Sequence, residues 1–474
     1  MTRGPRLRTT SHLSWNVEIG MADKLEKTQT KHRKLRLWHI PVMLLVVVVV
    51  GSLAVRWHWR REFRERIAAA RAAGYPVTLE ELDAWYEWPP AGDNAAYWIV
   101  DAASLHERPP QEDWRRLEQL VRVGGDRLDP TKPIPDDTME LLEQYVRSNA
   151  EALETLHSAA TISESRYPID LLKGPTTPIP HIGEVRHGCT LLCMEAVLLA
   201  SHGDPNGAAE AIAAALSVAG SLDQEPVPIS HLVRMGGAAW AASTLERTLH
   251  QAAFTDAQLE MLYRAFSDIH ADDGLLRSLA GEQCGMLSVF ERPWAIDSSF
   301  FHKPPPLPVL QAYAALGLSA REGTIFLDHM AECIRIVQLP TFERLAAVQA
   351  AEANFRGRRG LLVNVSEHVP SLISREVRTI AQIETAKTAL GVERYRLMQG
   401  MLPETLAPLV PRYLPKIPPD PFDGRSLRYK QTERGFVVYS VGEDGADDGG
   451  KEPPPPGKTR ESWETYDIVF RIDR

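Results

Sequence analysis

The longest apolar run in the chain extends from Leu37 to Val55, and its only ionisable residue is His39. At a rise of about 1.5 Å per helical residue, these 19 residues nearly cover the roughly 30 Å hydrocarbon core of a bilayer. Trp38 and Trp57 stand at the two ends of the run, where membrane-spanning helices often place tryptophan. The pattern predicts one transmembrane helix over residues 37–55.

The segments on either side of this run distinguish an anchor from a cleaved signal peptide. The run begins after 36 residues, and it is followed by an Arg-rich segment instead of a small-residue cleavage site. We therefore expect an uncleaved anchor, with a basic tail (1–36) before it and a helical stalk (56–91) after it.

The charges beside the span bear on its orientation. Lys and Arg are nearly balanced, with six in residues 22–36 and five in residues 56–70. Long domains cross membranes largely regardless of charge, whereas a short basic tail tends to stay in the cytoplasm. We expect a single-pass protein of the cell membrane with a cytoplasmic N-terminus and an extracytoplasmic bulk. Met21 is an alternative start that leaves this topology unchanged.

Apolar residues recur every three or four positions through residues 92–370, which is typical of helices packed through one face. Gly203 ends one such helix, Asp204 caps the next and Pro205 opens it. The pair loosely resembles a tetratricopeptide-type hairpin, without a 34-residue period. Capping-box spacing marks two further helix starts, at Thr255 and Ser319. We expect an extracytoplasmic domain of helical hairpins.

The pattern changes after about residue 371. A helix leads into a proline-rich extended stretch, and two alternating runs follow at residues 426–430 and 435–441. Alternation of this kind predicts an antiparallel hairpin, and residues 466–472 predict a third strand. The fold class is therefore mainly α, with a small α+β module over residues 371–474.

Composition excludes some classes of partner. The chain has 474 residues, a hydrophobic fraction of 44% and a formal net charge of −9. These values favour folded domains, and they exclude the broad basic surface that binding to nucleic acid requires. The four cysteines match neither a disulfide framework nor a zinc site, and we expect them to be small core residues. They are Cys189, Cys193, Cys284 and Cys333.

An acidic, glycine-rich loop follows the second predicted strand, over residues 439–450. Its four carboxylates would repel one another unless water or a cation screens them, so it is either a metal site or a solvated turn. They are Glu443, Asp444, Asp447 and Asp448. An EF-hand is excluded because Ala446 and Pro455 stand where its ligands should be.

A family resemblance covers roughly the last 100 residues. The order of a helix, the motif Asp-Pro-Phe-Asp-Gly at residues 420–424 and the loop sequence Tyr-Ser-Val-Gly-Glu-Asp-Gly at residues 439–445 resembles the soluble domain of type II secretion major pseudopilins. That family binds calcium in this loop. The resemblance implies Asp444 as its first ligand and Asp467 as a later one. Asp447 and Asp448, in the same acidic loop, are second-rank candidates for the metal site. The N-terminal apolar run lacks the family's Gly-Phe junction and its glutamate.

Catalytic motifs are weak. The chain has no nucleophile elbow, P-loop or HExxH motif, and the nearest zinc-like string runs from His181 to His187. Helical offsets of three and six residues turn the last histidine away from the first, so a polar helix entrance is favoured over a metal site. Glu282 lies in an apolar helix stripe, where we expect a paired carboxylate.

These patterns together predict a membrane-anchored bacterial protein that is a non-catalytic scaffold or interaction component of the cell envelope. Its protein partner would be an envelope or secretion component. The alternative is an extracytoplasmic hydrolase with its active site in a groove of the helical domain.

Overall fold

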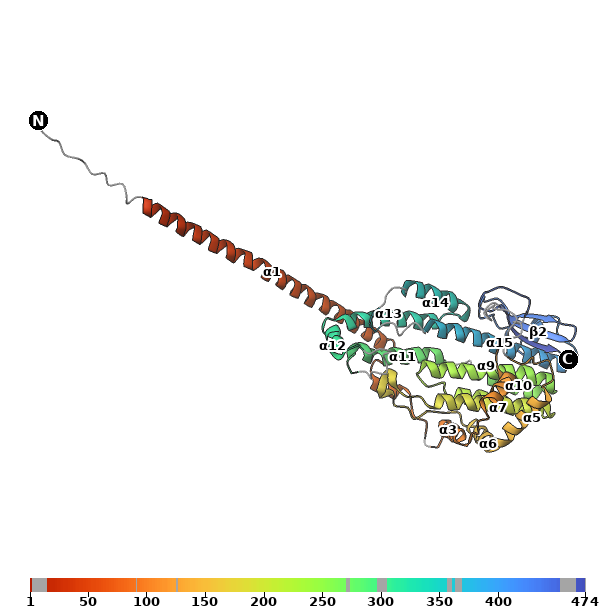
Figure 1. Cartoon of the computed structure of the whole chain (residues 1–474). Helices are drawn as coiled ribbons and strands as arrows, with labels where there is room; N and C mark the ends of the chain where they lie inside the picture. The colour runs from red at the N-terminus through yellow and green to blue at the C-terminus, as the bar shows by residue number, and fades with distance from the viewer. Residues whose placement is uncertain are drawn as a thin grey trace.

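The computed structural model describes residues 1, 15–90, 92–124, 127–269, 273–295, 305–355, 360–362, 369–451 and 466–473. Helices dominate, and a small three-stranded sheet lies near the C-terminus (Figure 1). The predicted fold class is confirmed at this level: a mainly helical chain with one apolar N-terminal helix and a small sheet. Residues 296–304 and most of residues 356–368 lie outside the described residues.

The first helix, α1 (Trp15–Ala72), is one continuous helix that projects from the folded body (Figure 1). From residue 39 it is long and apolar enough to cross a membrane, and its apolar window has no residue buried in the protein. The side chains from Ile40 to Val50 are exposed, whereas Phe63 is buried. The same helix therefore contains a bare apolar segment and a segment packed into the body.

The helices after α1 form the body. They are α2 (Leu79–Trp85), α3 (Ala95–Leu105), α4 (Gln111–Val121), α5 (Asp136–Ser148), α6 (Ala150–Ala159), α7 (His181–Ser201), α8 (Pro205–Gly220), α9 (Pro228–Gln251), α10 (Asp256–Asp268), α11 (Gly274–Glu291), α12 (Leu307–Ala315), α13 (Leu318–Val337), α14 (Thr341–Phe355) and α15 (Val369–Gln399). Two short 3-10 helices, η1 (Leu171–Thr176) and η4 (Ala407–Leu409), lie among them.

The predicted hairpin of α7 and α8 is confirmed. Gly203 has a φ of 80°, and Asp204 Oδ1 accepts a hydrogen bond of 3.0 Å from Gly207 N at the start of α8. Both helices bury almost all of one face, and the predicted stripe residues Val185, Cys189 and Ile212 are fully buried. The four cysteines are buried and unpaired, as expected for core residues.

The two predicted capping boxes have different outcomes. The box of Thr255 and Gln258 is present at the start of α10. The box at Ser319 is wrong, because α13 is capped by Gly317 and begins at Leu318. Glu322 does not return to the helix start. Its two carboxylate oxygens accept hydrogen bonds from Leu361 N and from Leu362 N.

The sheet has the order β1 (Arg428–Gln431), β2 (Gly435–Ser440) and β3 (Ile468–Asp473), with both pairs antiparallel. Val438 of β2 lies opposite Tyr429 of β1 and opposite Phe470 of β3. The predicted hairpin and third strand are confirmed. Val438 and Phe470 are buried, since this face of the sheet packs against the helices.

Two hydrophobic clusters make up the core. One contains Phe63 of α1 with residues of α11, α13, α14 and the beginning of α15. The other contains residues of α3 to α10 and continues through the later part of α15 into the sheet, where it includes Phe436 and Ile472. The predicted boundary at residue 371 lies within α15. This long helix contributes residues to both clusters.

Candidate functional site

The acidic loop after β2 is shaped by glycines in the left-handed region of backbone space. Their φ angles are 73° at Gly442, 68° at Gly445, 75° at Gly449 and 75° at Gly450. At Gly442 an added Cβ would also lie 2.6 Å from the carbonyl oxygen of Tyr466. Side chains are disfavoured in this region of φ, and here there is no space for one. The turn geometry accounts for the glycine content of the loop.

Two of the predicted ligands organise their own turns. Asp444 is exposed, and its Oδ1 accepts a 3.0 Å hydrogen bond from Ala446 N. Asp447 Oδ1 accepts hydrogen bonds from Gly449 N at 3.0 Å and from the hydroxyl of Tyr439 at 3.1 Å. Aspartates that bond the amide two residues ahead are typical of tight turns. Asp448 is exposed beside them.

Asp467, the fourth predicted ligand, lies just before β3 and is only 4% exposed. Its Oδ2 accepts a 2.7 Å hydrogen bond from Gly450 N, and its Oδ1 is buried without a hydrogen-bond partner among the described residues. Burial raises the pKa of the Asp467 carboxyl. The amides of Gly450 and Asp448 oppose this shift, and the charges of Asp447 and Asp448 add to it.

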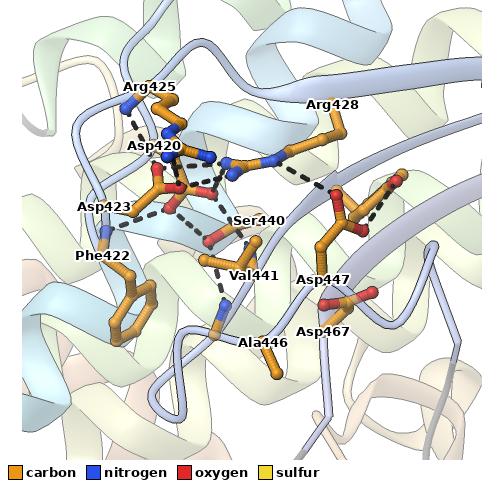
Figure 2. A network of polar contacts seen from close by, with 12 residues as sticks. Asp420, Phe422, Asp423, Arg425, Arg428, Ser440, Val441, Ala446, Asp447 and Asp467 are labelled. Atoms are coloured by element: carbon orange, nitrogen blue, oxygen red, sulfur yellow. Dashed lines mark hydrogen bonds and ion pairs between the residues drawn. The ribbon is translucent and has the colours of Figure 1, made fainter.

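Asp420, which opens the Asp-Pro-Phe-Asp-Gly motif, holds the base of the loop and is fully buried (Figure 2). Its Oδ1 accepts hydrogen bonds from Phe422 N at 3.0 Å and from Ser440 Oγ at 2.7 Å. Its Oδ2 accepts from Val441 N at 2.9 Å and from Arg428 at 2.6 Å. One carboxylate thus joins the motif, β1 and the end of β2.

Arg428 on β1 connects this carboxylate to the loop (Figure 2). Its guanidinium binds Asp420 and Asp423, and its Nε lies 3.9 Å from Asp447 Oδ2. The hydrogen bond to Asp423 raises the pKa of Arg428 against the effect of burial. For Asp423 burial raises the pKa, but the bonds from Arg428 and from Arg425 N outweigh it and the pKa is lowered. The motif is therefore an ionic anchor for the loop.

The four predicted ligands do not converge as one set. Asp444 is engaged in its own turn, and Asp467 interacts with Asp447 and Asp448. Within the described part of the chain, no group of three or more His, Cys, Asp or Glu side chains could hold a metal ion. Residues 452–465 of the same loop lie outside that part. The buried Oδ1 of Asp467 is the atom that best fits a cation, and calcium binding stays a prediction.

The free edge of β3 docks on α9 through two side chains. Glu246 Oε1 accepts a 2.8 Å hydrogen bond from Arg471 N, and His250 Nε2 accepts one of 3.0 Å from Asp473 N. The other oxygen of Glu246 forms a 2.5 Å ion pair with Arg127. An exposed edge strand is a template for pairing with other chains. Here side chains of the helical body take the place of a fourth strand.

A cavity of about 590 Å³ lies beside this contact. Its walls come from the segment before α5, from α9, from α15 and from the beginning of β3, where Asp467 lines it. Its charged lining also includes Arg247, which is fully buried and donates to the carbonyl oxygens of Leu120 and Leu128. Burial lowers the pKa of Arg247 to about 10. The cavity therefore adjoins the acidic loop at the junction of sheet and helices.

The two histidines of the zinc-like string lie in different surroundings. His181 is buried, its ring stacks on Tyr167 with centroids 4.0 Å apart, and its Nε2 lies 2.9 Å from Glu225. His187 is half-buried and accepts a 3.1 Å hydrogen bond at Nδ1 from Arg108. The helix therefore turns them apart, as their spacing predicts.

Glu225 is the centre of a buried polar cluster that the sequence did not indicate. Its carboxylate contacts His181, the hydroxyl of Tyr86 at 3.3 Å and Ser230 Oγ at 2.5 Å. All four residues are at most 3% exposed. The cluster joins α7 to the start of α9 and to the segment after α2, so it serves packing between elements.

A second histidine cluster surrounds His187. The ring of His106 lies 5.7 Å from it, and His106 Nε2 is 2.6 Å from the hydroxyl of Tyr145. Burial lowers the pKa of His106 to about 4, with further contributions from His187 and Arg108. Burial and the charge of Arg108 also lower the pKa of His187.

Glu282 has no hydrogen-bond or ion-pair partner among the described residues, although a paired carboxylate was expected there. Burial alone raises its pKa.

Four residues that hold the C-terminal module in place were not predicted as site residues from the sequence: Asp420, Arg428, Glu246 and His250. Asp420 has a local signal, because aspartate before proline favours a turn. Arg428, Glu246 and His250 have none, since their partners lie on other elements.

We compared the chain with protein-family models, curated proteins and solved structures, and none of the three comparisons gave a match.

Proposed function

We propose that this protein is a single-pass membrane-anchored scaffold or interaction component of the bacterial envelope, with its folded body outside the cytoplasm. The observation that carries this proposal is the continuity of α1. Its apolar part has no protein around it, and the same helix continues to Phe63, which packs against Phe290 with ring centroids 6.4 Å apart. An exposed apolar helix of this length is best explained by a lipid environment.

The apolar segment and the segment packed into the body belong to one continuous helix, which suits a scaffold. Arg66 of α1 forms a 2.5 Å ion pair with Asp328 of α13, and Phe63 lies where Gly323 leaves space. No loop separates the apolar segment from the body. The body would therefore be held at a set position relative to the bilayer, with the sheet at its far end (Figure 1).

The anchoring can be tested on the full chain in bacterial membranes. We expect the protein to resist alkaline carbonate extraction, and a C-terminal alkaline phosphatase fusion to be active. The double variant Val46→Arg and Val48→Arg should be extracted, because each arginine costs about 2.5–3.5 kcal/mol at the centre of a membrane helix. Leu172→Arg, an exposed apolar position of the body, is the matched control. Full extraction of the parent protein would contradict the proposal.

We also propose that the C-terminal module is pseudopilin-like and that its acidic loop binds calcium around Asp467. The buried Oδ1 of Asp467 supports this, as does the repulsion that Asp447 and Asp448 exert on that carboxyl. A cation would relieve this repulsion, and calcium accepts carboxylates together with backbone carbonyls.

Calcium titration of the full chain in detergent tests this second proposal. We expect millimolar calcium to raise the melting temperature of the parent, and to leave that of Asp467→Asn unchanged. Asp444→Ala should respond like the parent, since Asp444 is engaged in its own turn. A parent protein that does not respond, or an Asp467→Asn variant that responds fully, would reject the site. Magnesium at the same concentration controls for ionic strength.

A further inference from the structure

The helix α12 lies on the surface, and its exposed residues are mainly apolar, with Gln311 as the exposed polar one. Residues 305–320 contain no Asp, Glu, Lys, Arg or His. Leu310 and Ala314 face the body and are buried. On the outer side, Val309 is 48% exposed and Ala312 is exposed, and Leu316, which directly follows the helix, is 59% exposed. Large apolar side chains that gather on one exposed surface often mark a contact with a membrane or with another protein.

The position of α12 follows from how α13 lies along α1. An added Cβ at Gly317 would be 3.2 Å from Cγ of Arg56, and the guanidinium of Arg321 lies 5.8 Å from the ring of Trp59. Further along, Asp328 pairs with Arg66. The residue numbers rise together, so α13 runs beside α1 and away from the apolar segment. Because α12 precedes α13, it lies on the side of the apolar segment (Figure 1).

The level of α12 matches the end of the predicted span. Arg56 directly follows Val55, the last residue of the apolar run, and Gly317 lies against Arg56. Trp57 is 59% exposed at the same level, as expected for a residue at a membrane interface. The C-terminal end of α12 therefore lies at the level where the bare apolar segment of α1 ends.

The fold holds α12 in this place. Tyr313 of α12 donates a hydrogen bond to Glu322 of α13, and Glu322 also accepts the amides of Leu361 and Leu362. The outer face is thus presented by a fixed helix. Removing aliphatic side chains from water is favourable in proportion to the apolar area that is covered. Leu307, Val309 and Leu316 together would provide a substantial contact.

We propose that α12 is an interfacial helix that inserts its outer face into the bilayer and seats the body on the membrane. This inference rests on the proposed membrane anchoring. Lipid is the occupant because α12 ends at the level of Arg56, where the predicted span ends, and because its exposed face bears no charge that would select a protein partner. Interfacial helices insert about 5–10 Å into the boundary between headgroups and acyl chains.

Lipid quenching in the full chain tests the proposal. Leu316→Cys and Val309→Cys variants are labelled with a nitrobenzoxadiazole dye and reconstituted into vesicles of phosphatidylcholine and phosphatidylglycerol. The four native cysteines are buried, and the unmodified parent measures background labelling. Doxyl groups attached to the lipid chains close to the headgroup serve as shallow quenchers, and doxyl groups near the chain ends serve as the deep quenchers for residue 47. Val47→Cys reports the span, and Met398→Cys, exposed near the end of α15, reports water.

We expect shallow doxyl lipids to quench the dye at residues 316 and 309, and to leave residue 398 unquenched. Quenching at residue 47 but not at residue 316 would overturn the interfacial helix while leaving the anchor intact. A dye at residue 316 that is shielded from iodide but not quenched by lipid would assign this face to protein, such as a second copy, and would also overturn it. Absence of quenching at residue 47 would instead reject the anchoring.

Discussion

Asp420 shows how a single residue can fix the shape of the acidic loop. Its fully buried carboxylate accepts two backbone amides, one hydroxyl and the guanidinium of Arg428. Removal of one partner from a buried, hydrogen-bonded ion pair leaves the other groups without compensation. Asp444, in the loop after β2 of the same module, is exposed and accepts a hydrogen bond from Ala446 N of its own loop. We therefore expect the two aspartates to differ sharply in their contribution to the free energy of unfolding.

We predict that Asp420→Ala lowers the free energy of unfolding by about 3–5 kcal/mol. Asp444→Ala should change it by less than about 0.5 kcal/mol, as is usual for exposed positions. Thermal unfolding of the full chain in detergent, followed by circular dichroism, measures both. Equal melting temperatures for the two variants would contradict the buried role of Asp420.

A second prediction at the residue scale concerns pH. The pKa of His106 falls from its ordinary value of 6.5 to about 4 in the folded protein. Between these values the unfolded chain binds a proton at this residue and the folded protein does not. Stability that is present above pH 6.5 is therefore lost as the pH falls toward 4. His106→Gln should flatten the decline of melting temperature in this range, whereas the exposed control His202→Gln should keep it. An unchanged slope in His106→Gln would refute this.

At the scale of elements, the contact of β3 with α9 decides how the sheet is held. The strand pairs with β2 on one side, and Glu246 and His250 accept two of its amides on the other. Because Glu246 is buried and also pairs with Arg127, its loss would remove that ion pair and would leave the amide of Arg471 without its acceptor.

We predict that Glu246→Ala accelerates hydrogen exchange of residues 466–473 and lowers the free energy of unfolding by about 3–5 kcal/mol. Exchange of residues 435–440, which lie between the other two strands, should change less. Glu210→Ala, at an exposed position of α8, is the matched control. Mass spectrometry of the exchanged full chain distinguishes the two segments, and equal acceleration in both would mean that the whole sheet has opened.

At the scale of the whole molecule, the two hydrophobic clusters do not separate at residue 371, where the sequence pattern changes. Ile383 and Leu390 of α15 belong to the same cluster as residues of α7, α8 and α9, and the sheet joins that cluster through Phe436. Much of the hydrophobic core of the C-terminal module is therefore shared with the helical body.

We predict that a fragment of residues 371–474 does not fold by itself. Its long helix would expose the face that packs against α9 and α10, and β3 would lose its edge contacts. Proton–nitrogen correlation spectra of the fragment should show little dispersion, while adding purified residues 73–370 should restore it. A well-dispersed spectrum of the fragment alone would show that the module is independent.

The elements themselves were largely predictable. Residues whose role depends on neighbours in sequence behaved as expected, such as Asp204 at its helix cap and Gly203 before it. The predicted capping box at Ser319 is absent because Glu322 accepts hydrogen bonds from amides about forty residues later in the chain, which no local pattern can indicate. The candidate cation site was predictable as a loop but not as a set of ligands, since the direction of Asp444 depends on its own turn.

The sequence by itself determined the apolar span, the helical hairpins and the three strands. Each of these depends on the spacing of apolar residues and on turn residues within a few positions of one another. Tertiary structure alone decided that Asp420 and Arg428 hold the loop, that Glu246 and His250 close the sheet edge, and that α12 lies level with Arg56. These contacts join residues that are distant in the chain or whose partners are chosen by packing, and such choices follow from the shape of the assembled core.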